Sequence, residues 1–69
     1  MTVKEMIELN KTDLIEVRCN DYRRCLPVSR QFFIETRKGT DIWNEVAKKY
    51  TIEEYDGNND HESILIITL

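Results

Sequence analysis

The residues with the most distinctive chemistry lie between positions 19 and 25, where two cysteines bracket a polar run with two adjacent arginines, CNDYRRC. Two thiols at this spacing could form a disulfide or supply half of a zinc site. Structural zinc needs four ligands from Cys, His or carboxylate groups. The chain holds a single histidine, His61, far downstream. The sequence therefore favours two reduced cysteines, with Cys19 half-buried and Cys25 more exposed, and it predicts no metal and no cofactor.

The same stretch carries a second kind of chemistry, because arginines beside an aromatic ring are typical of contacts with single-stranded nucleic acid. The candidate nucleic-acid contacts are Arg18, Tyr22, Arg23, Arg24 and Arg30. Against this hypothesis, the formal net charge of the chain is −3. Nucleic-acid-binding domains are usually basic. Nucleic-acid binding is therefore the alternative function and not the first.

Charge is distributed unevenly along the chain. Residues 18–38 contain six basic residues against two acidic ones, whereas residues 39–69 contain seven acidic residues against two lysines. A dense carboxylate surface can dock on a basic groove of a partner and steer the association. It can also do no more than keep a small domain in solution. The candidate partner-binding residues are Glu45, Glu53, Glu54, Asp56, Asp60 and Glu62.

Two other kinds of site are disfavoured. Asp56, Asn58 and Asp60 match the first three ligand positions of an EF-hand loop, but His61 stands where the loop needs glycine and Ile67 where it needs glutamate. This stretch is therefore expected to be a hairpin loop. Catalysis by a nucleophile and a base needs both groups within hydrogen-bond reach in a pocket. The sequence has no phosphate-binding loop and no paired acid motif, so we expect no enzymatic activity and no catalytic residue.

These residues must be positioned by one small domain spanning residues 1–69, because a chain of 69 residues leaves no room for a second core. The first residues, Thr2-Val3-Lys4-Glu5, match the capping box of a helix N-terminus. Apolar residues at helical spacing then predict a short amphipathic helix over residues 3–10. Asn10 is expected to end it as a left-handed C-cap.

The polar run CNDYRRC lies between two stretches of alternating apolar residues, which predicts a β-hairpin. The apolar residues share one face when Ile15 pairs with Val28 and Val17 pairs with Leu26. The two cysteines do not face each other in this register, which argues against a disulfide. Pro27 cannot donate a hydrogen bond to a neighbouring strand, so the second strand of the hairpin should lie at the edge of a sheet.

The second half of the chain predicts one helix and two strands. Residues 42–49 have the spacing of a short helix, and residues 50–55 have the alternation of a strand. Residues 63–69 are uncharged and apolar on both faces, which predicts a central strand covered on each side. Residues 29–39 show no clear pattern. The expected fold is α+β, with an antiparallel sheet of about four strands, one N-terminal helix and one short middle helix.

The expected cellular location is inferred from two segment types that the sequence does not contain, a membrane span and a signal peptide. No stretch approaches the roughly 18 apolar residues that span a membrane, so no membrane partner is expected. The start MTVKEMIELNK has no apolar core of a signal peptide, which predicts a cytoplasmic protein. The second face of the central strand can be covered by the chain itself or by a second copy, so both a monomer and a homodimer remain open.

The chain begins with MTVKEMIELN, continues with a polar hairpin and closes with ESILIITL. It resembles in these parts the short phage and prophage accessory proteins of Gram-positive bacteria, a set that includes anti-CRISPR proteins. The resemblance does not cover residues 29–49 and assigns no site residue. It implies a protein without enzymatic activity that binds and inhibits a host defence complex, a larger protein or ribonucleoprotein, in the bacterial cytoplasm. The predicted function is therefore inhibition by binding through the acidic surface.

Overall fold

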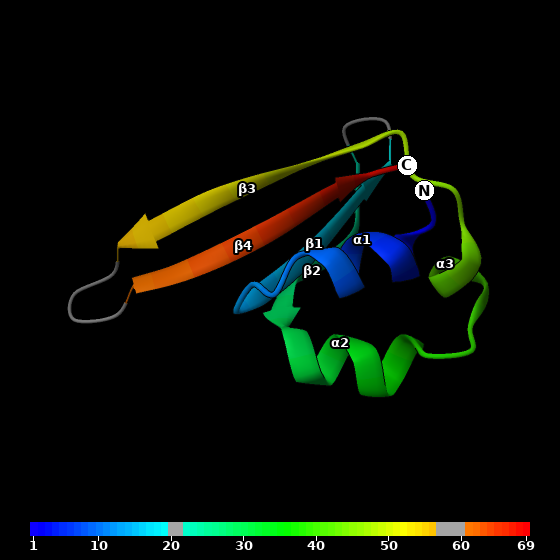
Figure 1. Ribbon diagram of the computed structural model, residues 1–69, viewed down its shortest axis with the longest axis horizontal. Coiled ribbons are helices and arrows are strands. Elements are labelled where there is room, and N and C mark those ends of the chain that lie inside the picture. Colours follow the sequence, from blue (N-terminus) through cyan, green and yellow to red (C-terminus); the bar gives the residue numbers. More distant parts are fainter. Residues whose placement is uncertain (20–21, 57–60) are drawn as a thin grey trace.

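The computed structural model of the chain describes residues 1–19, 22–56 and 61–69. Its elements follow in the order α1 (Val3–Leu9), β1 (Leu14–Cys19), β2 (Tyr22–Ser29), α2 (Arg30–Arg37), α3 (Asp41–Asn44), β3 (Lys49–Asp56) and β4 (His61–Thr68). The strands form one sheet in the order β2-β1-β4-β3, and the helices lie together on one of its faces (Figure 1). The predicted small α+β fold is confirmed. None of these helices is long and apolar enough to cross a membrane.

The sheet is mixed and not antiparallel throughout. Strands β1 and β2 pair antiparallel, as do β3 and β4, but β1 and β4 run parallel. The apolar strand β4 therefore has a neighbour on each side, which confirms the predicted central strand. The chain reaches this arrangement because α2 and α3 carry it from β2, at one edge, to β3 at the other.

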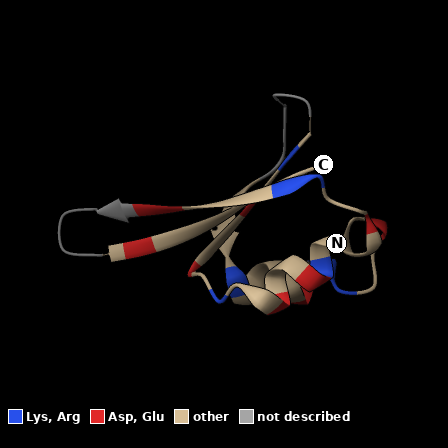
Figure 2. Ribbon diagram, turned by 45° about the horizontal axis from the view of Figure 1, so that its top comes forward, with Lys and Arg blue, Asp and Glu red and all other residues tan. Residues whose placement is uncertain are grey.

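The core lies between the sheet and the helices. Ile15 and Val17 of β1 pair with Leu65 and Ile67 of β4, and all of them are buried in one cluster. The helices add Val3, Met6, Ile7, Phe33 and Trp43 to this cluster. No helix of the described chain lies on the opposite face of the sheet (Figures 1 and 2). Ile66 of β4 and Glu16 of β1 are nevertheless buried on this face, so the predicted burial of β4 on both sides holds at Ile66 without a helix. We call the side without helices the open face.

The first helix begins as the capping box predicts. The hydroxyl of Thr2 accepts a hydrogen bond from the backbone N–H of Glu5, and the Glu5 carboxylate accepts one from the backbone N–H of Thr2. The left-handed cap expected at Asn10 is wrong, because Asn10 is extended with φ −122°. Its backbone N–H and its side-chain amide both donate to the carbonyl oxygen of Met6, at 3.1 Å and 2.9 Å.

The hairpin of β1 and β2 keeps part of the predicted register. The pair Ile15–Val28 is confirmed, but Val17 pairs with Cys25 and not with Leu26. The register shifts between Ile15 and Val17, because Leu26 and Pro27 together take the place opposite a single residue of β1. A bulge suits proline, which has no N–H for the ladder, and β2 is an edge strand as predicted.

The cysteines are not aligned across the hairpin, because Cys19 pairs with Tyr22 and Cys25 pairs with Val17. Cys19 is half-buried and its thiol is free. The side chain of Cys25 lies outside the described part of the structure, as do residues 57–60, where the calcium-like spacing falls.

The stretch without a clear pattern, residues 29–39, contains α2 (Arg30–Arg37). Ser29 caps this helix by accepting a hydrogen bond from the backbone N–H of Phe32, and Phe33 is its buried anchor. The predicted helix over residues 42–49 is wrong beyond Asn44. The next residues pair with the start of the chain, because Val3 N donates to Glu45 O and Ala47 N donates to Met1 O.

Candidate functional site

The fold divides the predicted acidic surface. Glu53 and Glu54 are neighbours in β3, so their side chains lie on opposite faces of the sheet. Glu53 pairs with Ile64 and lies on the open face, together with Glu62. Glu54 pairs with Ser63 and lies on the face that carries the helices. These three carboxylates surround one end of the β3–β4 hairpin and do not form one flat patch.

Among the remaining predicted acidic residues, Glu45 has a described side chain and lies apart from this group. Glu45 follows α3 and precedes β3, and its carbonyl oxygen accepts from Val3 N, so it lies at the opposite end of β3 from Glu53 and Glu54. Asp56 ends β3, and its side chain lies outside the described part of the structure. Asp60 also lies outside the described residues. The acidic group therefore centres on β3.

Strand β3 forms an edge of the sheet and exposes apolar side chains beside its carboxylates. Tyr50 and Ile52 pair with the core residues Ile67 and Leu65, so they point toward the helix layer. They remain 40% and 48% exposed, because the helices cover β1 and β4 and do not extend over β3 (Figure 1). We call Tyr50, Ile52, Glu53 and Glu54, with the free backbone edge of their strand, the β3 edge.

Two of the predicted nucleic-acid contacts are held in internal interactions. Arg18 forms an ion pair with Glu16, a carboxylate buried on the open face of β1. Arg30 donates from Nη2 to the carbonyl oxygen of Ile7 at 2.8 Å, which joins α2 to the end of α1. Tyr22, Arg23 and Arg24 lie in β2, and their side chains are outside the described part of the structure.

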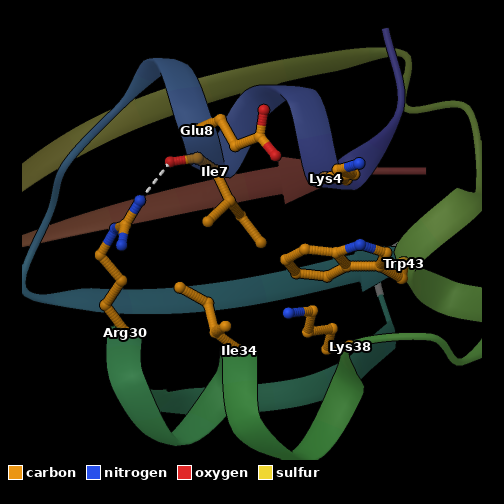
Figure 3. Close-up of a pocket in the computed structure, with 7 residues that line it drawn as sticks. All are labelled: Lys4, Ile7, Glu8, Arg30, Ile34, Lys38 and Trp43. Carbon is orange, nitrogen blue, oxygen red and sulfur yellow. Dashed lines mark hydrogen bonds between the residues drawn. The ribbon is translucent and has the colours of Figure 1, made fainter.

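A cavity of about 360 Å³ lies between α1 and α2, with α3 at one end (Figure 3). Its size falls within the range of small-molecule sites. The lining comes from three elements and the residue after α2: Lys4, Ile7 and Glu8 from α1, Arg30, Ile34 and Lys38 from α2 and its C-cap, and Trp43 from α3. We call it the α1–α2 pocket.

The α1–α2 pocket combines an apolar wall with an excess of positive charge. The indole of Trp43 reaches into the space between the helices, with Lys4 on the α1 side and Lys38 on the α2 side (Figure 3). Glu8 is the one acidic residue of this lining. In the described part of the chain, no ion pair joins Lys4 or Lys38 to a carboxylate.

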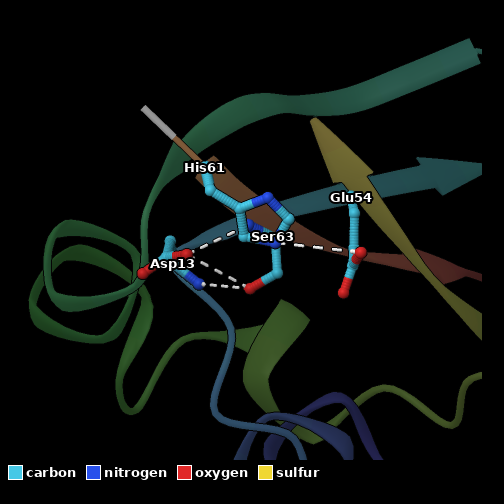
Figure 4. Close-up of polar contacts among 4 residues, drawn as sticks. All are labelled: Asp13, Glu54, His61 and Ser63. Carbon is cyan, nitrogen blue, oxygen red and sulfur yellow. Dashed lines mark hydrogen bonds and ion pairs between the residues drawn. The ribbon is translucent and has the colours of Figure 1, made fainter. Parts of the chain in front are cut away.

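A third group of polar side chains joins β1 to β4 near the end of the β3–β4 hairpin (Figure 4). The carboxylate of Asp13 accepts from the backbone N–H of Ser63 at 3.0 Å and from its hydroxyl at 3.2 Å. The backbone N–H of Asp13 lies 3.2 Å from the same hydroxyl oxygen. His61 lies 3.8 Å from the carboxylate of Glu54, and both side chains are mostly exposed. The Ser63 hydroxyl thus both accepts from and donates to Asp13, and these hydrogen bonds join the residue before β1 to β4.

Few local patterns predict the α1–α2 pocket, because its walls meet only after folding. Arg30 and Lys38 belong to the stretch without a clear pattern, and Lys4 is separated from them by a whole hairpin. The usable signal is local: Lys4 and Glu8 are one helical turn apart, which places them side by side on α1. Within residues 1–19, 22–56 and 61–69, no group of three or more His, Cys, Asp or Glu side chains could hold a metal ion.

No protein-family model, curated protein or solved structure matches this chain. Proposals about its function are therefore argued from the two surfaces described above, the β3 edge and the α1–α2 pocket.

Proposed function

We propose that this chain is a non-enzymatic binding protein that docks on a larger protein or ribonucleoprotein complex through the β3 edge. One observation carries the proposal: an eight-residue edge strand exposes two apolar side chains beside two carboxylates. Among the described strands, β3 pairs with β4 alone, so the N–H and C=O groups on its outer side have no strand partner.

Each part of the β3 edge suits a protein partner. A free strand edge can accept a strand of another chain through main-chain hydrogen bonds. Exposed Tyr50 and Ile52 supply apolar contact area beside it, and Glu53 and Glu54 complement a basic groove. A competing explanation is that the two carboxylates only protect the edge from aggregation, as charged residues on edge strands often do.

The resemblance of the chain ends to phage accessory proteins extends the proposal. The partner is then a host defence complex in the bacterial cytoplasm, and the acidic β3 edge occupies a basic surface of that complex where nucleic acid would otherwise lie. A homodimer formed by two β3 edges is a second arrangement of the same surface, and it would hide the edge from other partners.

The test is a pull-down with the tagged chain from lysate of a Gram-positive bacterium, with and without nuclease. Glu53→Lys and Glu54→Lys are compared with Glu35→Lys, which makes the same charge change at an exposed position of α2. We expect a stoichiometric protein partner that survives nuclease. Each reversal on β3 should weaken its capture by about tenfold or more, since charge reversal at an interface opposes a basic partner. Glu35→Lys should capture the partner as the unchanged chain does.

The separate reversals on β3 also report which face of the strand meets the partner, because Glu53 and Glu54 point to opposite sides. Equal capture by all three variants would show that the carboxylates only protect the edge. Bound material that disappears with nuclease would favour the Arg-rich hairpin as the functional surface. Loss of the partner together with a doubled mass in solution would favour the homodimer.

A further inference from the structure

We infer that the α1–α2 pocket binds a small organic anion with a flat apolar body. The pocket lies between the helices, away from the β3 edge, so this inference does not depend on the proposed function (Figure 1). Ligand sites of this size usually combine an apolar lining with a few polar groups that fix the orientation of the ligand. The α1–α2 pocket has both features.

The charge of the lining selects an anion. Lys4, Arg30 and Lys38 face a single acidic residue, Glu8, across a cavity of about 360 Å³. A cleft lined mainly by one sign of charge concentrates ligands of the opposite sign. Lys4 and Lys38 come from different elements and lie on opposite sides of the Trp43 indole, so a cation borders the apolar wall on each side (Figure 3).

Arg30 adds a positive charge that no described carboxylate pairs with. Its guanidinium donates one hydrogen bond, from Nη2 to the carbonyl oxygen of Ile7 at 2.8 Å, and forms no ion pair within the described part of the chain. Its Nε atom is buried and has no hydrogen-bond partner among the described residues, so an anion in the cavity would not contact this atom. An anion in the α1–α2 pocket would still lie near the positive charge of the guanidinium, which pairs with no described carboxylate.

The apolar wall selects a flat body for the ligand. Trp43 presents its indole to the cavity, and the side chains of Ile7 and Ile34 face each other across it (Figure 3). An aromatic ring prefers a planar partner in offset or edge-to-face contact, with a gain beyond the buried area alone. Ile7 is fully buried and Trp43 is 8% exposed, so the accessible part of this wall comes from Ile34 and Trp43, and a compact inorganic anion would leave it without a partner. An aryl carboxylate, sulfonate or phosphate would use the wall and the cations together.

The test uses a matched pair of dyes. The anion 8-anilino-1-naphthalenesulfonate has a neutral counterpart, N-phenyl-1-naphthylamine, which is the same ring system without the sulfonate. Binding is followed by quenching of Trp43, the sole tryptophan, and by the increase in dye emission. We expect saturable binding of one anionic dye per chain, at least about tenfold tighter than binding of the neutral dye.

Four variants test where the dye binds. Lys4→Gln and Lys38→Gln should each weaken the anionic dye about threefold, and Glu8→Gln should strengthen it about threefold, as expected for partly exposed charges. Lys49→Gln is the control, because Lys49 is an exposed lysine on the open face. It should leave the affinity unchanged. These positions are exposed, so the variants should fold, which circular dichroism checks.

Three results would overturn the inference. The first is an anionic dye that does not saturate, and the second is equal affinity for the two dyes. The third is a Lys49→Gln variant that weakens the dye as much as Lys4→Gln and Lys38→Gln do, because this would show attraction by overall charge.

Discussion

Replacing Thr2 by alanine tests whether α1, which forms one wall of the α1–α2 pocket, is held by its first turn. The helix has seven residues, and isolated helices shorter than about 12 residues are marginal in water. Thr2 Oγ1 accepts from the backbone N–H of Glu5 at 3.2 Å, and the Thr2 N–H donates to the Glu5 carboxylate at 3.0 Å. The helix delivers Val3, Met6 and Ile7 to the core, so a weaker helix should weaken the whole domain.

The expected loss follows from the single cap bond. Thr2→Ala leaves the Glu5 N–H without its side-chain partner at an exposed site, which should lower the free energy of unfolding by about 1 kcal/mol. In a domain of this size, such a loss lowers the melting temperature by roughly 4–8 °C. The urea midpoint should fall by about 1 M if the free energy of unfolding decreases by about 1 kcal/mol per M of urea. The emission of Trp43, which is 8% exposed in the core, reports the transition.

Thr2→Ser is the matched control, because serine keeps the hydroxyl that accepts from Glu5 and should retain most of the stability. The reasoning about the capping box is refuted if the alanine and serine variants unfold at the same urea concentration. In that case α1 would be held by packing and by its backbone bond from Val3 to Glu45.

Two further predictions concern the core and the pH dependence. Phe33 is fully buried, so Phe33→Ala should lower the free energy of unfolding by about 3–5 kcal/mol and leave the domain largely unfolded by circular dichroism. The neighbouring Phe32 is 54% exposed, so Phe32→Ala should change the free energy of unfolding by no more than about 0.5 kcal/mol. The hydrogen bond from the backbone N–H of Thr2 holds the pKa of the Glu5 carboxyl below its ordinary value, and the bond from the Thr2 hydroxyl lowers this pKa further. A lowered folded pKa contributes stability above the unfolded pKa and loses it as the pH falls through the folded pKa. Urea unfolding should therefore show Glu5→Gln less stable than the unchanged chain near neutral pH and equally stable below the folded pKa; a gap that persists there would contradict this.

Local signals predicted several elements of the fold correctly. The capping box at Thr2 and Glu5 depends on residues three positions apart, so it can be recognised without knowledge of the rest of the chain. The uncharged run at the C-terminus marked β4 as a central strand for a similar reason, because its apolar character on both faces is local. The parallel pairing of β1 with β4 depends on where the chain returns, which no local pattern records.

The wrong predictions, of helix after Asn44 and of the hairpin register, lie where contacts with distant residues compete with local structural preference. Residues 45–49 have helical spacing, but Glu45 and Ala47 bond to the backbone at the start of the chain, and Lys49 begins β3. In the hairpin, the bulge at Leu26 and Pro27 shifts the register by one residue between Ile15 and Val17, and a second shift follows between Val17 and Arg18. Tertiary contacts outweighed the periodic pattern in both places.

The candidate sites show why charge counted along a chain does not predict charge on a surface. The α1–α2 pocket is basic because Lys4, from a stretch with more acids than bases, lies beside Arg30 and Lys38 from the basic stretch. Within the acidic stretch, Glu53 and Glu54 are adjacent in sequence but lie on opposite faces of β3. A run of like charge predicts one patch only when its residues share a face of one element, at a spacing of two in a strand or of three and four in a helix. The surfaces to test are therefore a basic pocket and an acidic strand edge on different sides of one domain, and the paired charge variants at each should act independently.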